Sequence, residues 1–403
     1  MLGTLFAIAL LAPAPGPAPA PASDKGALVV AQGEVPDVRL IDVAIDVFAP
    51  GVSDTPASPL LEKGIRASVR KSEARFIPTH LRNTLQSTGQ WGAVRVVPGG
   101  ASWAELLVTG KILKSNGKDL AIELTAQDAT GRVWLDRKYA QRADVTAYAK
   151  DRPLDGRDPF QALYNRVAND LLRARDRRSP KELEAVRALA ELRFAAYMSP
   201  EPFAAYLAND DEWTSHVVRL PAADDPMLAR VRAIRSRDDI LIDTLNEYYS
   251  DFYARMDKSY DDWRAYNYDE QKALDSIESK SLLKKIGGAV AVLAGIFLLD
   301  PYDDHGMKDV MIIGGIAAID AGFKDDKEKG IHKASLSELA DSFEGEITPL
   351  LVDVDGKVVQ LTGSAEGQYQ KWRELLRQIA ETDAPLPADI NVVPMAPGEV
   401  VQP

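Results

Sequence analysis

The feature that most constrains the fold is a long run of apolar residues with helical spacing in the middle of the chain. The apolar positions recur at steps of three and four over Met227, Val231, Ile234, Leu241, Leu245, Tyr248, Phe252, Met256, Tyr260, Trp263, Leu274 and Ile277. This spacing predicts one long helix, or a helix pair, with an apolar face. Upstream, the run Ser179-Pro180-Lys181-Glu182 is typical of a helix start with a capping box. We therefore expect residues 179–285 to form a helical arm.

Aromatic residues are dense in the same region, in the stretch NEYYSDFYARMDKSYDDWRAYNY. They alternate with Asp and Glu rather than with Lys and Arg, which argues against stacking on nucleic acid. One interpretation is that these residues form the core between packed helices, with the tyrosine hydroxyl groups in contact with water. The other is a surface for a partner protein, formed by Tyr249, Tyr253, Tyr260, Trp263 and Tyr266.

The overall composition excludes several functions. Among 403 residues the formal net charge is −12, which argues against nucleic acid as a partner because phosphate binding rests on Lys and Arg. The chain contains no cysteine, so disulfides, thiolate catalysis, zinc–thiolate sites and a lipid-modified N-terminal cysteine are excluded.

The first residues have the pattern of an export signal. An apolar run is followed by a Pro/Ala stretch, and Ala20 and Ala22 form the small-x-small pattern that precedes signal-peptidase cleavage. We expect residues 1–22 to be a signal peptide and 23–36 a linker, with the protein in the periplasm or at the outer membrane of a Gram-negative bacterium. No Lys or Arg precedes the apolar run, so a disordered leader on a cytosolic protein is the alternative.

Residues 37–178 have the pattern of an α/β interaction domain. The stretch VRLIDVAIDVF predicts a half-buried strand with Ile41, Val43, Ile45 and Val47 on one face and Asp42 and Asp46 toward solvent. EARFIPTHLRNTLQSTG predicts a helix with Pro78 near its start and Gly89 at its end. AVRVVP predicts a second strand.

Three more strands and a helix complete this region. ELLVTGKIL and DLAIELTAQD are joined across Asn116-Gly117, a dipeptide that tight hairpins prefer, and VWLDRKY follows. Asp158 as a cap and Pro159 in the first turn predict a closing helix. Its buried stripe is expected to hold Phe160, Leu163, Val167 and Leu171.

This order of elements, carried by the stretch EARFIPTHLRNTLQSTGQWGAVRVVP, resembles a small α/β domain of bacterial envelope proteins. It is similar to the amino-terminal domain of TolB and to the periplasmic part of CsgG-type secretion lipoproteins over residues 37–145. The chain lacks the lipid-anchor cysteine of the CsgG type and the propeller repeats of TolB. The resemblance implies an interaction module and brings no catalytic motif, and a shared fold does not establish function.

Two glycine-rich segments, GGAVAVLAG at 287–295 and GGIAAIDAG at 314–322, follow the same pattern G-G-x-x-A-x-x-A-G. In helices, residues four apart share a face, so each segment would present a groove of small side chains for close helix packing. We expect a glycine-rich helical hairpin at 286–323. Its candidate packing residues are Gly287, Gly288, Ala291, Gly295, Gly314, Gly315, Ala318 and Gly322.

Three roles for this hairpin remain open: internal packing within one subunit, insertion into a membrane, or an interface in a homo-oligomer. Each apolar run is about 22 Å long as a helix, shorter than the ~30 Å hydrocarbon core of a bilayer. Asp320 lies inside the second run, where a carboxylate in lipid is costly. Both points disfavour full membrane spanning.

The C-terminal part is expected to contain a β-hairpin and a helix at 324–385, with Asp355-Gly356 at the turn. The helix should bury Tyr369, Trp372, Leu376 and Ile379. Residues 386–403 form a Pro-rich tail.

No motif for a reaction or a cofactor is recognisable. The chain has no G-x-S-x-G, no phosphate loop and no G-x-G-x-x-G between a strand and a helix. The acidic set Asp300, Asp303, Asp304, His305 and Asp309 does not have calcium-loop spacing, so no metal site is expected.

These observations predict an α+β protein that is a non-catalytic, exported, envelope-associated scaffold or assembly component and forms oligomers. Its expected partners are envelope proteins or copies of itself, with the membrane as a further contact and without nucleic acid or cofactor. One alternative is a periplasmic enzyme with a site on the α/β domain. Another is a membrane-inserting, pore-type protein acting through the glycine-rich hairpin.

Overall fold

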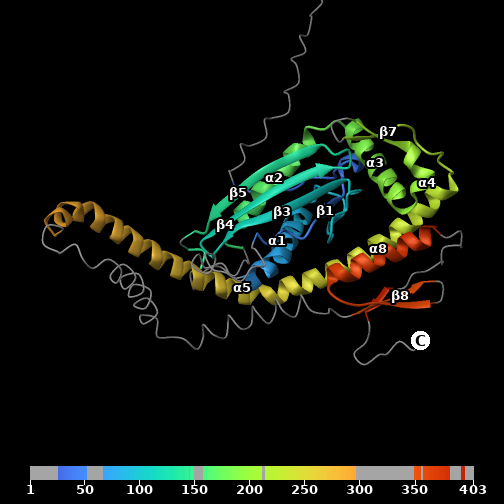
Figure 1. Cartoon of the computed structure of the whole chain (residues 1–403). Coiled ribbons are helices and arrows are strands. Elements are labelled where there is room, and N and C mark those ends of the chain that lie inside the picture. The colour runs from blue at the N-terminus through green and yellow to red at the C-terminus, as the bar shows by residue number, and fades with distance from the viewer. Residues whose placement is uncertain are drawn as a thin grey trace, which may run out of the picture.

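The structure of the protein is a computed structural model, and it describes residues 26–51, 67–144, 146–148, 158–210, 214–295, 349–354, 357–381 and 392–394. Within these residues the fold is mixed α+β, as predicted: helices pack on a five-stranded sheet, and two small sheets lie beside it (Figure 1). The signal-peptide residues, the second glycine-rich segment and the acidic set around His305 lie outside the described residues.

The main sheet has the strand order β2-β1-β3-β4-β5. Its strands are β1 (Val43–Ile45), β2 (Val94–Val96), β3 (Leu106–Ser115), β4 (Asp119–Asp128) and β5 (Val133–Arg142). β1 is parallel to both β2 and β3, while β3, β4 and β5 form an antiparallel meander. The predicted succession of strands and hairpins is therefore confirmed.

Ile41, Val43 and Ile45 pack in one cluster, as predicted, but Val47 packs in the cluster on the other face, and the prediction of a half-buried strand is wrong. All three β1 residues are buried, because the sheet face opposite the Ile41 and Val43 cluster is covered by other elements and Ala44 packs there. Asp42 and Asp46 are also not free solvent-facing groups. Asp42 accepts a hydrogen bond from the Ala93 N–H and Asp46 accepts from the Gly99 N–H.

Helix α1 (Ala67–Ser87) begins earlier than predicted, so Pro78 lies inside it rather than near its start. Proline has no N–H to donate to the carbonyl four residues back, here that of Ala74. The Phe48 N–H donates to this carbonyl at 2.9 Å instead. The segment after β1 thus supplies the bond that the helix lacks, and Pro78 is accommodated without an unsatisfied carbonyl.

Helix α2 (Gln161–Asp176) lies beside α1, and both pack on the sheet (Figure 1). It begins later than predicted, so Asp158 and Pro159 precede its first turn. The Asp158 carboxylate accepts from the Phe160 N–H at 2.7 Å. The predicted buried stripe is confirmed, with Phe160, Leu163, Val167 and Leu171 all at most 1% exposed.

Helix α3 (Pro180–Met198) starts with the predicted capping box between Ser179 and Glu182. It leads through α4 (Pro200–Phe203) and a 3-10 turn, η2 (Ala204–Tyr206), to a two-stranded sheet. That sheet pairs β6 (Leu207–Asn209) with β7 (Ser215–Val217). Another 3-10 turn, η1 (Asp37–Arg39), precedes β1 and contacts α3.

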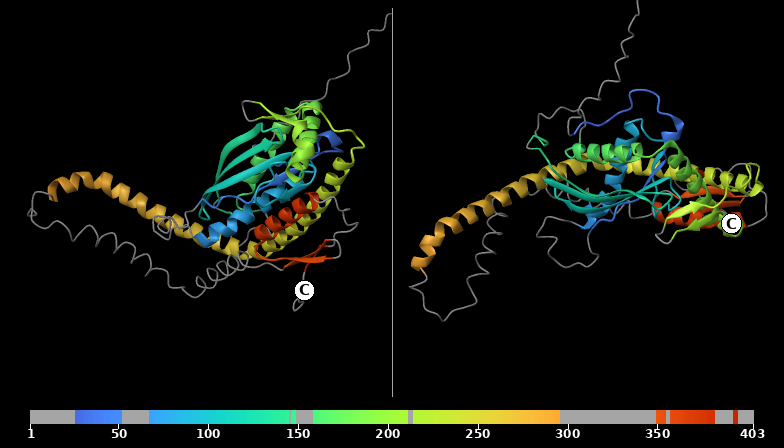
Figure 2. Two further views of the ribbon diagram at one scale, coloured as in Figure 1. Left: turned by 45° about the vertical axis from the view of Figure 1, so that its right-hand side comes forward. Right: turned by 90° about the horizontal axis from the view of Figure 1, so that it is seen from above.

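Helix α5 (Pro226–Gly295) is a single helix of 70 residues. Its amino-terminal part packs against α1, α3, α8 and β2, and its remaining length runs out past the sheet (Figures 1 and 2). The predicted long helix is confirmed as one helix rather than a pair. It continues beyond residue 285 and includes the first glycine-rich segment.

The C-terminal elements pack on the opposite end of α5 from the projecting part (Figure 1). Strands β8 (Leu350–Val354) and β9 (Lys357–Leu361) form the predicted antiparallel pair, β10 (Val392–Pro394) adds to β8, and helix α8 (Ala365–Glu381) contacts α5. Tyr369, Trp372 and Leu376 are fully buried, and Ile379 is partly buried.

Two large hydrophobic clusters stabilise the fold, beside a small third one around Val186 and Leu189 of α3. The first lies between α1, α2 and the sheet. The second joins α3, α5 and α8 to the other side of β1 and β2, so the helical and C-terminal regions share one core with the sheet. The body therefore does not divide at the boundaries between the three sequence regions.

Candidate functional site

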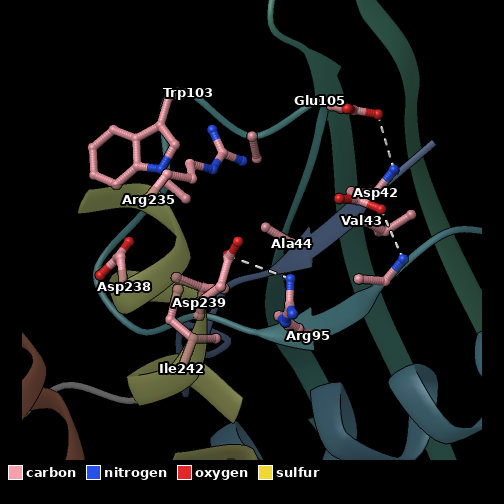
Figure 3. A pocket seen from close by; sticks show the side chains of 14 residues that line it. Asp42, Val43, Ala44, Arg95, Trp103, Glu105, Arg235, Asp238, Asp239 and Ile242 are labelled. Atoms are coloured by element: carbon pink, nitrogen blue, oxygen red, sulfur yellow. Dashed lines mark hydrogen bonds and ion pairs between the residues drawn. The ribbon is translucent and has the colours of Figure 1, made fainter. Parts of the chain in front are cut away.

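A polar cleft lies where the sheet meets α3 and the first turns of α5. It consists of two adjoining hollows, the larger with a cavity volume of about 330 Å³ and the smaller with about 40 Å³. Both hollows are lined by Asp42, Glu105, Arg235 and Asp239. Figure 3 shows the smaller hollow with Asp239 and Arg235 on α5 facing the strands that carry Asp42 and Arg95.

Asp42 and Glu105 stand directly before parallel strands β1 and β3, so the sheet brings them together. The Asp42 N–H donates to Glu105 Oε2 at 3.1 Å, and Asp42 Oδ1 accepts from the Ala93 N–H at 2.7 Å. Gly92 leaves room for this carboxylate, because a Cβ there would lie 2.2 Å from Asp42 Oδ1. Burial raises the pKa of Glu105, and the charge of Asp42 adds to this rise.

Two arginines hold carboxylates of the cleft from opposite sides. Arg187 of α3 donates from Nε to Glu105 Oε1 at 3.2 Å. Arg95 of β2 binds Asp239 at 3.4 Å and Asp243 at 2.6 Å. Burial raises the pKa of Asp239, and Arg95 opposes the rise.

Asp238 is the most buried carboxylate of the cleft, with 1% of its surface exposed. Its Oδ2 accepts a long hydrogen bond, 3.4 Å, from the Tyr369 hydroxyl of α8, and its Oδ1 has no donor among the described residues. Burial and the neighbouring charge of Asp239 raise the pKa of Asp238 to about 7. A carboxyl group with this pKa can exchange a proton near neutral pH.

Arg235 is the cation of the cleft that the described residues leave without a hydrogen-bonding partner. Its guanidinium lies 5.1 Å from the ring centroid of Phe194 and is half-buried. Within the described part of the chain it makes no hydrogen bond or ion pair, although its charge opposes the rise in the pKa of both Asp238 and Asp239. An aromatic platform fixes the plane of a guanidinium while leaving its N–H groups available to an anion.

A second polar cluster is internal and links α1, α2 and α5. Glu73 is fully buried and accepts from the Ser115 hydroxyl at 2.5 Å and the Tyr260 hydroxyl at 2.6 Å. Burial raises its pKa. His80 is bonded at Nδ1 to the Tyr253 hydroxyl and at Nε2 to the Gln161 amide oxygen. Glu73 Oε1 and both His80 nitrogens thus have partners inside the core. Glu73 Oε2 lies 3.3 Å from Arg70 Nε as an ion pair and has no hydrogen bond among the described residues.

The predicted aromatic partner surface is mostly inside the protein. Tyr249, Tyr260 and Trp263 are 0%, 2% and 5% exposed, so these three side chains are not available to a partner in this fold. Tyr253 is half-buried and stacks on Phe76, and Tyr266 is exposed. The helix–helix core interpretation therefore applies to the first three.

The structure places the first set of predicted packing residues but not the second. Gly287, Gly288, Ala291 and Gly295 lie in the last turns of α5. The other four, Gly314, Gly315, Ala318 and Gly322, lie outside the described residues. No helix within the described part of the chain is both long and apolar enough to cross a membrane. In the same part, no three carboxylate or imidazole side chains gather in an arrangement that could hold a metal ion.

Sequence reasoning did not identify the cleft. Asp42 was visible as a polar residue beside a strand, but Glu105, Arg235 and Asp239 have no spacing that marks them. Only the folded chain brings Glu105 to Asp42, 63 positions away. The RSRDD stretch that contains Arg235 and Asp239 has the composition of an ordinary charged helix segment.

Comparison of the chain with protein-family models, with curated proteins and with solved structures finds no match. Function must therefore be argued from the residues and the geometry of this chain.

Proposed function

We propose that the protein is a non-catalytic, exported assembly component of the cell envelope that forms oligomers through its projecting helix. The observation that carries this proposal is the length of α5 relative to the body that holds it. A 70-residue helix extends about 105 Å at 1.5 Å per residue. No single small domain can cover a helix of this length, so part of it is available to another molecule.

Among the described residues, the side-chain contacts that hold α5 to the rest of the fold lie in the first two thirds of the helix. The last contacts of described side chains are near the turn between β3 and β4. There Tyr268 packs in the hydrophobic cluster between α1, α2 and the sheet, and Gln271 Oε1 accepts a hydrogen bond from Asn116 Nδ2 at 3.4 Å. From Lys272 to Gly295 the helix runs past the sheet for about 36 Å (Figure 1). We call this stretch the α5 arm.

Buried polar contacts between the first part of α5 and the rest of the fold support a fixed direction for the α5 arm. Asn246 of α5 bonds the edge strand β2 on both sides: its Oδ1 accepts from the Val96 N–H at 2.8 Å, and its Nδ2 donates to the Val96 carbonyl at 2.9 Å. Arg82 of α1 donates to Asn246 Oδ1 as well, at 2.9 Å. A helix held by buried, satisfied polar contacts is rigidly oriented, which suits a presenting scaffold.

The end of the arm carries the first glycine-rich segment. Glycine in an isolated helix costs about 1 kcal/mol relative to alanine. Gly287, Gly288 and Gly295 would therefore weaken the arm unless another helix packs closely on it. By helical spacing Gly287, Ala291 and Gly295 share a face, which supports an oligomer in which copies of this segment meet.

Sedimentation velocity on the chain from Ser23 onward, with and without residues 286–323, tests the proposal. We expect the intact chain to sediment as an oligomer and the deletion as a monomer, with circular dichroism showing no loss of helix beyond the deleted end of α5. A monomeric intact chain would contradict the proposal.

Alkaline extraction of washed membranes tests whether the same segment inserts into lipid. The membranes come from cells that express either the intact chain or the deletion. Retention of the intact chain together with release of the deletion would place the segment in the membrane. Release of both versions would exclude insertion into the membrane, and the sedimentation result would then distinguish an oligomer interface from internal packing.

A further inference from the structure

The polar cleft has the features of a ligand site that is separate from the α5 arm. Its larger hollow, about 330 Å³, is at the lower end of the range for small-molecule sites. Among the residues that line the two hollows there is no hydroxyl, imidazole or amine side chain, so the lining offers carboxylates, guanidinium groups and apolar walls. Such a lining recognises charge.

Two charged groups of the cleft lack a hydrogen-bonding partner among the described residues. Asp238 Oδ1 is buried without a donor in the described residues, although buried carboxylate oxygens are normally satisfied. Arg235 holds a guanidinium over Phe194 without an acceptor among the same residues. A missing donor and a missing acceptor in one cleft point to a ligand that carries both.

The negative and positive side chains of the cleft also lie at different positions within it. Asp42 and Glu105 lie on the strand side, Asp239 faces them from α5, and Arg235 lies one turn before Asp239 on the same helix (Figure 3). Arg187, Arg232 and Arg95 are already bonded to Glu105, Glu191 and Asp239 respectively. The carboxylates therefore form a site for a cation, and Arg235 alone is placed to take an anion.

We propose that this cleft binds a free α-amino acid, with Arg235 receiving its carboxylate and Asp239 and the unsatisfied Asp238 receiving its ammonium group. The two charged groups of an α-amino acid are close together, which matches a site with both signs of charge within two helical turns. The side chain of the ligand would lie in the larger hollow against Phe194 and Val231. This inference goes beyond the proposed assembly role and does not depend on it.

Isothermal titration calorimetry on the intact chain, with each of the twenty common amino acids as the probe, tests the proposal. We expect at least one of them to bind with a stoichiometry of one per chain. Ethylamine and acetate, which carry only one of the two charges, should bind at least tenfold more weakly than the best amino acid. If no amino acid binds, or if ethylamine or acetate alone binds equally well, the cleft is not an amino-acid site.

Two variants of the cleft and one matched control test whether the amino acid binds at the assigned residues. Arg235→Gln and Asp239→Asn should each weaken binding at least tenfold. Arg232→Gln removes a guanidinium that lines the same hollow but is paired with Glu191, and it should change the affinity less than threefold. Unchanged thermal unfolding of Arg235→Gln would show that it is folded. Equal losses in Arg232→Gln and Arg235→Gln would overturn the assigned role of Arg235.

Discussion

Arg264 of α5 and Asp158, which precedes α2, form a buried ion pair. Arg264 Nη1 lies 2.6 Å from Asp158 Oδ2, and the two side chains are 2% and 4% exposed. Arg264 also pairs with Asp261 one turn earlier, and its guanidinium lies 4.2 Å from the ring centroid of Tyr260. The pair connects the long helix to the helix that covers the sheet, just before α5 leaves the body.

Breaking this pair should destabilise the fold. Arg264→Met leaves Asp158 buried without its cation, and losing one partner of a buried pair costs about 3–5 kcal/mol. We expect a loss of this size in the free energy of unfolding, measured in urea. Lys258→Met is the control, because it breaks an exposed pair with Asp262 on the same helix and should change the free energy of unfolding far less. Equal losses would mean that the buried pair does not secure α5.

Gly117, in the turn between β3 and β4, should not tolerate a side chain. Its φ is +77°, and a Cβ would lie 2.2 Å from the Arg264 carbonyl oxygen of α5. Gly117→Ala should therefore cost more than Gly100→Ala, where φ is +75° but nothing lies within 4 Å of the added Cβ. The backbone strain is common to both changes, about 1 kcal/mol. The excess in Gly117→Ala measures how closely α5 approaches the hairpin, and equal costs would contradict that close contact.

Asp238 should make stability fall as the pH rises toward 7. Burial, with the charge of Asp239, raises the pKa of Asp238 from 3.8 to about 7, so between these values the folded protein holds a proton that the unfolded chain has released. The ionised group thus opposes folding at higher pH, by roughly 4 kcal/mol at most. Asp238→Asn removes this ionisation while preserving size. The free energy of unfolding of Asp238→Asn, relative to that of the wild type, should therefore be higher at pH 8 than at pH 5.

Urea unfolding at the two pH values measures this difference. Glu247→Gln, which removes an exposed carboxylate from the same helix, controls for the general loss of one negative charge. If Asp238→Asn shifts the free energy of unfolding equally at pH 5 and pH 8, Asp238 does not carry the raised pKa.

Local signals predicted much of the fold. The Ser179 capping box, the Asn116-Gly117 turn and the three-and-four spacing along α5 each appear in the structure as expected. These features depend on residues that are neighbours in sequence. Pro78 misled the prediction of the α1 start, because the Phe48 N–H that compensates for it comes from a segment 30 positions earlier.

The candidate site could not be predicted because it depends on tertiary contacts. Asp42 looked like a solvent-facing residue of an amphipathic strand, since the sequence does not show that α5 lies on the second face of the sheet. Tyr249 and Trp263 likewise could have been surface or core until the position of α1 beside α5 was known.

The most direct test of the assembly role uses the absence of cysteine from the chain, which makes a single introduced thiol unique. Ala291→Cys places it on the face shared by Gly287 and Gly295, and Ala289→Cys places it about 160° away around the helix. Under mild oxidation we expect Ala291→Cys to form a two-chain disulfide product and Ala289→Cys to remain a single chain. Failure of Ala291→Cys to link two chains, or equal linkage in both variants, would contradict an oligomer built through the small-residue face of the α5 arm.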